Sequence, residues 1–267
     1  IRSTSCTIFL AFPVILLHRI TPFGLGLTSI ASFVLLMFSP LLGMKALVPF
    51  GALMVFLCAR LLLWEFRRPA FWVFLGTPMM VWLSSLVFFF FLEDPLSKWI
   101  VASAVSLLIT LYAENCFTFY HLPSAYQAYA LENLSMVVYV LSAFFFTSGA
   151  FGAQLFLLLP TWIPTLLVFF AVLFATTAVF WVSKIGFETG RPYAIVGAIV
   201  MAELYATLSM LPTSFVTNAA LFSVLLYAFF VFARANVMER MTRVMVLRQS
   251  GFVAVLFLLI LLTARWF

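Results

Sequence analysis

The chain has very few charged side chains. Asp, Glu, Lys and Arg make up 8% of its 267 residues, whereas ordinary soluble domains contain about a quarter. Hydrophobic residues make up 66%, and Phe alone occurs 34 times. This composition excludes a water-soluble globular domain and predicts an integral membrane protein.

The residue types that carry most enzyme chemistry are also scarce. There are eight acids, two histidines and three cysteines, and the cysteines have no CxxC spacing, so neither a disulfide framework nor a zinc site is indicated. The signatures of nucleotide hydrolysis, zinc proteolysis, serine esterases and haem attachment are absent. We predict no catalytic residues, no metal site and no cofactor, and the sequence favours a non-enzymatic role without deciding it.

Long unbroken apolar runs are present instead, and only helices use such runs well in lipid. About 20 residues cross a bilayer as a helix, which predicts an all-α, polytopic transmembrane bundle that forms a single integral membrane domain, 1–267. Nine spans are expected: Phe23–Leu42, Ala46–Trp64, Ala70–Leu92, Trp99–His121, Asn133–Thr147, Trp162–Val182, Tyr193–Leu211, Phe215–Ala233 and Ser250–Phe267.

Two apolar segments are ambiguous. Residues 1–19 form a doubtful leader or a short tenth span, because the apolar part is brief and contains Pro13. The stretch Gly149–Pro160 is bounded by glycine and proline, which favours a half-embedded connector.

The basic residues are divided unevenly between alternate loops. One set of loops holds nine of the 14, and the other holds Lys45, Lys98 and Arg265. Because Lys and Arg concentrate in cytoplasmic loops, we expect the basic-rich loops to face the cytoplasm and the C-terminus to lie outside. The bases are scattered between spans, so lipid head groups rather than nucleic acid are their expected partners. The basic-rich set is Arg19, Arg67, Arg68, Lys184, Arg191, Arg234, Arg240, Arg243 and Arg248.

The longest basic loop, 234–249, has an amphipathic pattern. Val237, Met241 and Val244 recur at helical spacing opposite Arg240 and Arg243. This predicts a cytoplasmic helix on the membrane surface, where the two arginines meet anionic head groups. Alternatively, the segment only extends and anchors the preceding helix.

One span carries its polar residues in a single stripe. On a helical projection Ser103, Ser106, Thr110, Glu114, Thr118 and His121 all lie within about 60° of Ser103. A carboxyl facing lipid is costly, so this stripe should face the bundle interior. Glu114 would then be the titrating group of a proton or ion path. The alternative is that the stripe serves helix packing.

Arg60 is the expected partner of Glu114. The two residues lie 14 and 15 positions into their spans, at depths of about 21 and 22 Å. A buried pair would lower the insertion cost of both side chains. Alternatively, Arg60 extends toward the cytoplasmic surface beside Trp64.

Glu203 is the second acid expected inside the membrane. It lies ten residues into its span, about 15 Å deep, with Thr207 as a neighbour for hydrogen bonding. Its helix also carries a ridge of small residues, which lets another helix approach closely. We interpret it first as a packing helix and second as the site of a coupling acid. The ridge consists of Ala194, Ala198, Ala202 and Ala206.

The region around Glu114 resembles uncharacterised multi-pass membrane proteins of candidate-phyla bacteria. The similarity is in LYAENCFTFYHLPSAYQAYALENLSMVVYVLSAFFF, residues 111–146, where an acidic span end is followed by a short loop and a new span. The resemblance implies an inner-membrane location and no particular activity.

Three functions remain open from the sequence. The first is a transport or permease-like bundle for an ion, a proton or a small molecule, with Glu114 and Glu203 in the pathway. The second is a membrane scaffold or assembly protein with a membrane-protein partner. The third is a lipid-processing enzyme with Glu114, His121 and Glu132 at the cytoplasmic face, although their spacing matches no tight set of metal ligands.

Overall fold

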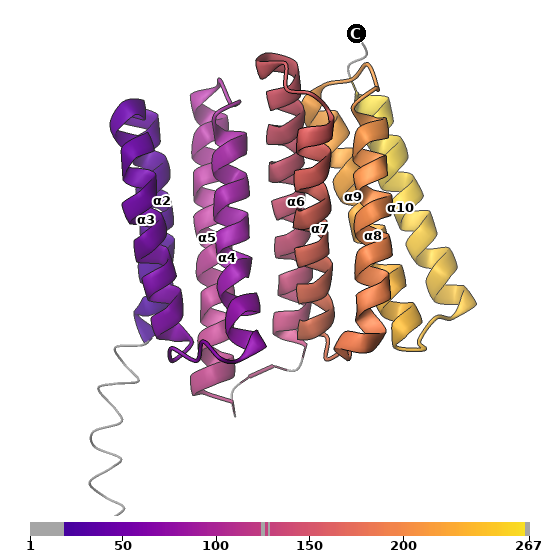
Figure 1. The fold of residues 1–267 in the computed structure, drawn as a ribbon, viewed down its shortest axis with the longest axis horizontal. Helices are drawn as coiled ribbons and strands as arrows, with labels where there is room; N and C mark the ends of the chain where they lie inside the picture. The colour runs from indigo at the N-terminus through magenta and orange to yellow at the C-terminus, as the bar shows by residue number, and fades with distance from the viewer. Residues whose placement is uncertain (1–18, 124–125, 128, 265–267) are drawn as a thin grey trace, which may run out of the picture. The chain divides into compact units, whose positions relative to one another are not determined.

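The computed structural model describes residues 19–123, 126–127 and 129–264. The predicted leader therefore lies almost entirely outside the described residues. Nine α-helices make up most of the described part of the chain (Figure 1). They are α2 Thr21–Phe38, α3 Pro40–Leu61, α4 Pro69–Phe89, α5 Pro95–His121, α6 Ala130–Leu157, α7 Trp162–Val182, α8 Phe187–Leu208, α9 Phe215–Val237 and α10 Arg243–Thr263.

Eight of these helices are long and apolar enough to cross a membrane, by length and composition. This confirms the predicted all-α, polytopic helical bundle. The exception is α8, which has 22 residues but is not among the eight. It carries three charged residues, Glu188, Arg191 and Glu203, and these lower its mean hydropathy.

Helix starts follow from local chemistry. Proline is the first residue of α3, α4 and α5, where its fixed φ suits the first turn and its missing N–H is not needed. Asp94 caps α5 by accepting a hydrogen bond from the Ser97 amide at 2.8 Å. Ser214 caps α9 and Thr242 caps α10 in the same way, which satisfies amides that the helix leaves free.

The chain divides into two compact units. Unit 1 contains described residues from 19–82 and 93–134, and unit 2 contains 83–92 and 135–264. Within unit 1, α2 packs against α3 and α5 around fully buried Leu25, Phe33 and Ile109. The expectation of a single membrane domain stays a prediction.

Unit 2 is built on successive neighbouring helices. Within it α8 packs against α7 and α9, and α10 packs against α9. The core includes Tyr205, Phe222 and Phe230, all fully buried. By contrast, α10 contributes no buried residue.

The predicted connector Gly149–Pro160 is wrong over most of its length. The helix α6 continues without a break to Leu157. Its glycines permit close packing instead of a turn: a Cβ at Gly149 would lie 2.5 Å from Val87 Cγ1, and one at Gly152 would lie 3.0 Å from the Phe91 ring.

The predicted surface helix over 234–249 is also wrong. The helix α9 ends at Val237, and α10 begins only at Arg243. Glu239 has φ 54°, and the Arg240 amide donates to the Ala235 carbonyl at 2.9 Å, the Schellman pattern that ends helices. Arg240 and Arg243 are exposed, as predicted, but they lie on a loop and at the start of a new helix.

Candidate functional site

The polar stripe of α5 lies against α2. The Ser106 hydroxyl donates to Ser29 Oγ at 3.2 Å, and both residues are buried. One turn further, a Cβ on Gly26 would lie 2.0 Å from Thr110 Oγ1, so only glycine allows this approach. The middle of the stripe therefore faces the interior of unit 1, as the sequence predicted, while Ser103 at its start is exposed.

A buried hydrogen-bond network extends this contact to α4. The Trp82 indole N–H donates to Ser32 Oγ at 3.0 Å, and the Ser32 hydroxyl donates to the Ser29 carbonyl at 2.6 Å. Trp82, Ser32 and Ser29 are at most 2% exposed. Sequence reasoning missed all three residues. The available signal was the pair of serines three residues apart in an apolar run, which places both on one helix face.

Glu114 is half-buried, and its Oε2 atom is buried without a hydrogen-bond partner. The neighbouring threonines do not serve it. The Thr110 hydroxyl donates to the Ser106 carbonyl at 2.8 Å, and the Thr118 hydroxyl donates to the main-chain carbonyl of Glu114 at 2.9 Å. Buried polar atoms are nearly always paired, so this carboxyl oxygen is an exception in the described structure.

No ion pair joins Arg60 to Glu114 in the described structure. Arg60 lies in the last turn of α3, because that helix ends at Leu61, three residues before the predicted end. His121 Nε2 donates to the Leu61 carbonyl at 3.2 Å, which places the end of α3 beside the end of α5. Glu114 lies seven residues earlier on α5, about 10 Å along its axis. The equal depths inferred from the sequence are therefore wrong.

Glu203 is exposed on the surface of α8. The helix begins at Phe187, six residues before the predicted span, and ends at Leu208, three residues before the predicted end. Glu203 therefore lies only about 8 Å from the C-terminal end of the helix. The Thr207 hydroxyl donates at 2.9 Å to the main-chain carbonyl of Glu203 and not to its carboxyl group. The same helix face exposes Val196 and Val200.

The small-residue ridge of α8 is a packing surface, as predicted. Ala194, Ala198 and Ala202 are all buried. Close to this ridge, a Cβ on Gly197 would lie 2.0 Å from the Phe229 ring of α9. The ridge therefore holds α8 within unit 2, whereas Glu203 points away from that packing.

The proposed cluster of Glu114, His121 and Glu132 does not form a metal centre. Among the described residues, no group of three or more His, Cys, Asp or Glu side chains is arranged to hold a metal ion. His121 Nε2 is bonded to the end of α3, and Glu132 is buried in the first turn of α6.

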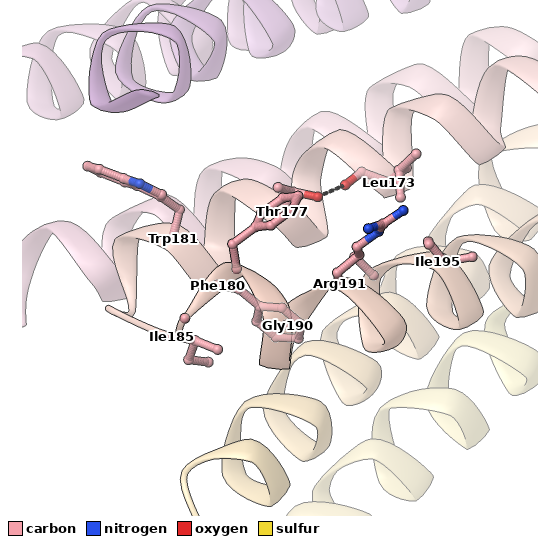
Figure 2. Close-up of a pocket in the computed structure, with 11 residues that line it drawn as sticks. Leu173, Thr177, Phe180, Trp181, Ile185, Gly190, Arg191 and Ile195 are labelled. Atoms are coloured by element: carbon pink, nitrogen blue, oxygen red, sulfur yellow. Dashed lines mark hydrogen bonds between the residues drawn. The ribbon is translucent and has the colours of Figure 1, made fainter. Parts of the chain in front are cut away.

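An apolar groove of about 240 Å³ lies between the end of α7 and the start of α8. Figure 2 shows Phe180, Trp181 and Ile185 around it, with Arg191 contributed by α8. The Thr177 hydroxyl donates to the Leu173 carbonyl at 2.7 Å. Arg191 is the only charged residue among those that line the groove. The lining therefore does not combine a general acid with a general base.

No protein-family model, curated protein or solved structure matches this chain. The fold alone therefore defines its class, and eight apolar helices of sufficient length make it a multi-pass membrane protein in contact with a lipid bilayer.

Proposed function

We propose that this protein is a proton-coupled, permease-like transporter of the cytoplasmic membrane, and that Glu114 takes up and releases the coupled proton. One observation carries this proposal: the Glu114 carboxyl group has a buried oxygen that no described donor satisfies. Ionisable groups within membrane spans are costly and usually functional. A carboxyl group held only for packing would be expected to have a hydrogen-bond partner.

The polar side chains around Glu114 support a path along the axis of α5. Thr110 and Thr118 lie one turn before and after it, and His121, the other titratable group of the stripe, lies at the helix end. Neighbouring positions on such a stripe are about 5–6 Å apart, so a proton moving between them requires intervening water. The buried hydroxyls of Ser106 and Ser29 add two further polar groups where α5 meets α2.

The basic residues support the proposed orientation. In unit 2, all six described Lys and Arg residues lie near the end of the helices that carries the α7–α8 and α9–α10 loops. In unit 1, Arg67 and Arg68 lie in the loop after α3, whereas Lys45 and Lys98 lie near the opposite helix ends. The basic-rich ends face the cytoplasm under the positive-inside rule, and the C-terminus then lies outside. The six residues of unit 2 are Lys184, Arg191, Arg234, Arg240, Arg243 and Arg248.

Proton flux into liposomes tests the role of Glu114. The purified chain is reconstituted with an internal pH dye, and a potassium diffusion potential is imposed. We expect flux above that of empty vesicles, a loss of at least about tenfold in Glu114→Gln, and unchanged flux in Glu203→Gln, whose side chain is exposed. Glutamine keeps the shape of the side chain but cannot release a proton.

Infrared difference spectroscopy between two pH values provides a second readout that needs no transported substrate. We expect a carboxylic-acid carbonyl band that is present in the wild-type chain and missing in Glu114→Gln. Absence of proton flux in the wild-type protein, or equal flux in Glu114→Gln, would contradict the proposal.

A second candidate function, assembly with another membrane protein, is favoured by the position of Glu203. An acid on an otherwise apolar, exposed helix face is costly against acyl chains, by about 2.5–3.5 kcal/mol near the bilayer centre and less toward its edges. A partner helix with a donor or a base would lower that cost. A photo-crosslinker at Val200 should then capture protein, whereas one at buried Ala198 should not. Crosslinks to lipid alone at Val200 would exclude this function.

A further inference from the structure

A polar cavity of about 290 Å³ lies at one end of unit 2. Its wall is formed by the last turns of α6, the α6–α7 connection, the α8–α9 loop and the first turn of α9. In Figure 1 these segments are the upper ends of α6, α8 and α9, opposite the basic loops of the same unit. The polar residues that line it are Gln154, Thr161, Ser209, Thr213 and Asn218.

All of these polar groups are uncharged. No Asp, Glu, Lys, Arg or His is among the lining residues. The helix ends give no strong net field either, because the negative ends of α6 and α8 lie here together with the positive ends of α7 and α9. A charged ligand would lose its hydration without gaining a counter-charge, so the cavity favours a neutral ligand.

Two side-chain amides are held in place by their oxygen atoms. The Tyr205 hydroxyl donates to Gln154 Oε1 at 3.0 Å, and the Thr213 hydroxyl donates to Asn218 Oδ1. Asn218 is only 4% exposed. The amide nitrogens, Gln154 Nε2 and Asn218 Nδ2, are bonded to no described residue. Each can donate two hydrogen bonds, so the cavity presents free donors to a ligand rich in acceptors.

Aromatic rings complete the wall. Phe151 lines the cavity and stacks on Tyr205, with ring centroids 4.3 Å apart and an interplanar angle of 15°. Phe215 is a second aromatic residue in the lining. A ligand that fits has apolar C–H faces for the rings and hydroxyl oxygens for the amides. The volume is close to the lower limit of about 300 Å³ for ligand pockets, which limits the ligand to roughly one ring.

We propose that this cavity binds a neutral, polyhydroxylated group of the size of one sugar ring. Such a group is supplied either by a free sugar or by the head group of a glycolipid, and the two sources share the chemistry that the cavity recognises. The site lies in unit 2 and uses none of the residues of the Glu114 path. Sugar binding at this cavity can therefore be tested independently of the proposed proton transport.

Calorimetric titration of the whole chain in phosphatidylcholine nanodiscs tests the proposal, because sugar-based detergents would compete for the cavity. One arm adds methyl α-glucoside, and the other incorporates monoglucosyl diacylglycerol into the nanodisc and follows its protection from a soluble glucosidase. Binding in the first arm identifies a free sugar as sufficient. Protection in the second arm alone identifies the glycolipid head group.

Gln154→Met removes the amide but keeps a chain of similar length, and Gln249→Met on α10 is the matched control. One lost hydrogen bond should weaken binding by about 3- to 10-fold in Gln154→Met, with no change in the control. Thr161→Ala, at the exposed rim, should weaken binding to a smaller extent and gives a second test if Gln154→Met fails to fold. The proposal is overturned if the wild-type chain binds neither glucoside, if Gln154→Met binds as well as wild type, or if inorganic phosphate binds more tightly than the glucoside.

Discussion

The hydroxyl of Ser32 holds two helices of unit 1 together through one indole. Trp82 Nε1 donates to Ser32 Oγ, and both side chains are nearly fully buried. Removing the acceptor leaves the indole N–H without its partner, and an unsatisfied buried donor costs more than a hydrogen bond contributes.

Ser32→Ala should therefore lower the free energy of unfolding by about 1–3 kcal/mol. Ser103→Ala, on the exposed start of the α5 stripe, should change it by less than about 0.5 kcal/mol. Thermal unfolding of the detergent-solubilised protein, followed by tryptophan fluorescence, measures both. Equal stability of the two variants would show that the indole finds another acceptor.

Asp94 makes the stability of α5 depend on pH. Its carboxylate accepts hydrogen bonds from the amide and the hydroxyl of Ser97, and these bonds lower the pKa of Asp94 below its usual value. Because the native pKa is the lower one, the contribution is complete above the unfolded value of about 3.9 and is lost as the pH falls through the native pKa.

Asp94→Asn should remove this acid-dependent part of the unfolding curve, because the asparagine amide caps helices without titrating in that range. Glu93→Gln is the control, since Glu93 makes no side-chain hydrogen bond in the described structure. Unfolding midpoints measured from neutral pH down to about pH 3 compare the two variants. A wild-type curve identical to that of Asp94→Asn would contradict the role of the cap.

At the scale of the helices, the close contact between α2 and α5 depends on Gly26, which has no side chain. A Cβ at Gly26 would meet Thr110 Oγ1 at 2.0 Å and the Ser106 carbonyl oxygen at 3.3 Å. The hydroxyl can rotate away, but a main-chain carbonyl moves only with its helix. We expect Gly26→Ala to destabilise the protein by about 1–3 kcal/mol through overpacking.

Gly251→Ala in α10 is the matched variant, because nothing lies within 4 Å of its Cβ. Removing a glycine from a helix interior there should stabilise the protein by about 0.5–1 kcal/mol. Opposite signs in the same thermal assay are the expected outcome. Stabilisation by Gly26→Ala would mean that the two helices are not in close contact.

The helices themselves could be predicted from apolar runs, because only helices satisfy the backbone in lipid. The positions at which the helices end were predicted less accurately. Glycines near 149–152 indicated a turn, but here they are sites of close helix packing. The end of α9 depends on Glu239 in a left-handed conformation, for which the sequence contains no glycine signal.

The candidate sites could also be predicted only in part. The periodic stripe on α5 placed Glu114 on the correct face, because spacing along one helix is fixed. The partnership with Arg60 depended on the relative depth of two helices, and an error of a few residues in the end of α3 was enough to break it. The polar cavity of unit 2 draws residues from four segments, and no local pattern joins them.

At the scale of the whole molecule, the orientation can be tested by labelling. Single cysteines at Lys184, in the α7–α8 loop, and at Pro212, in the α8–α9 loop, lie at opposite ends of unit 2 and are both exposed. In intact cells a membrane-impermeant maleimide should react with Pro212→Cys at once and with Lys184→Cys only after permeabilisation. Cys6, which lies outside the described residues, is replaced by serine in both variants, and Cys58 and Cys116 are buried and should contribute little background. The reverse labelling pattern would invert the proposed orientation.

The helix α10 packs against α9 yet buries none of its own residues. In water such a helix would drive aggregation, but in a bilayer acyl chains solvate it about as well as leucine side chains would. Exchanging a lipid neighbour for a protein neighbour along this helix thus carries almost no hydrophobic penalty in either direction. Whether lipid or protein lies against α10 is decided by shape and by lipid composition. A change of lipid can therefore change the neighbours of this helix without any change in the sequence.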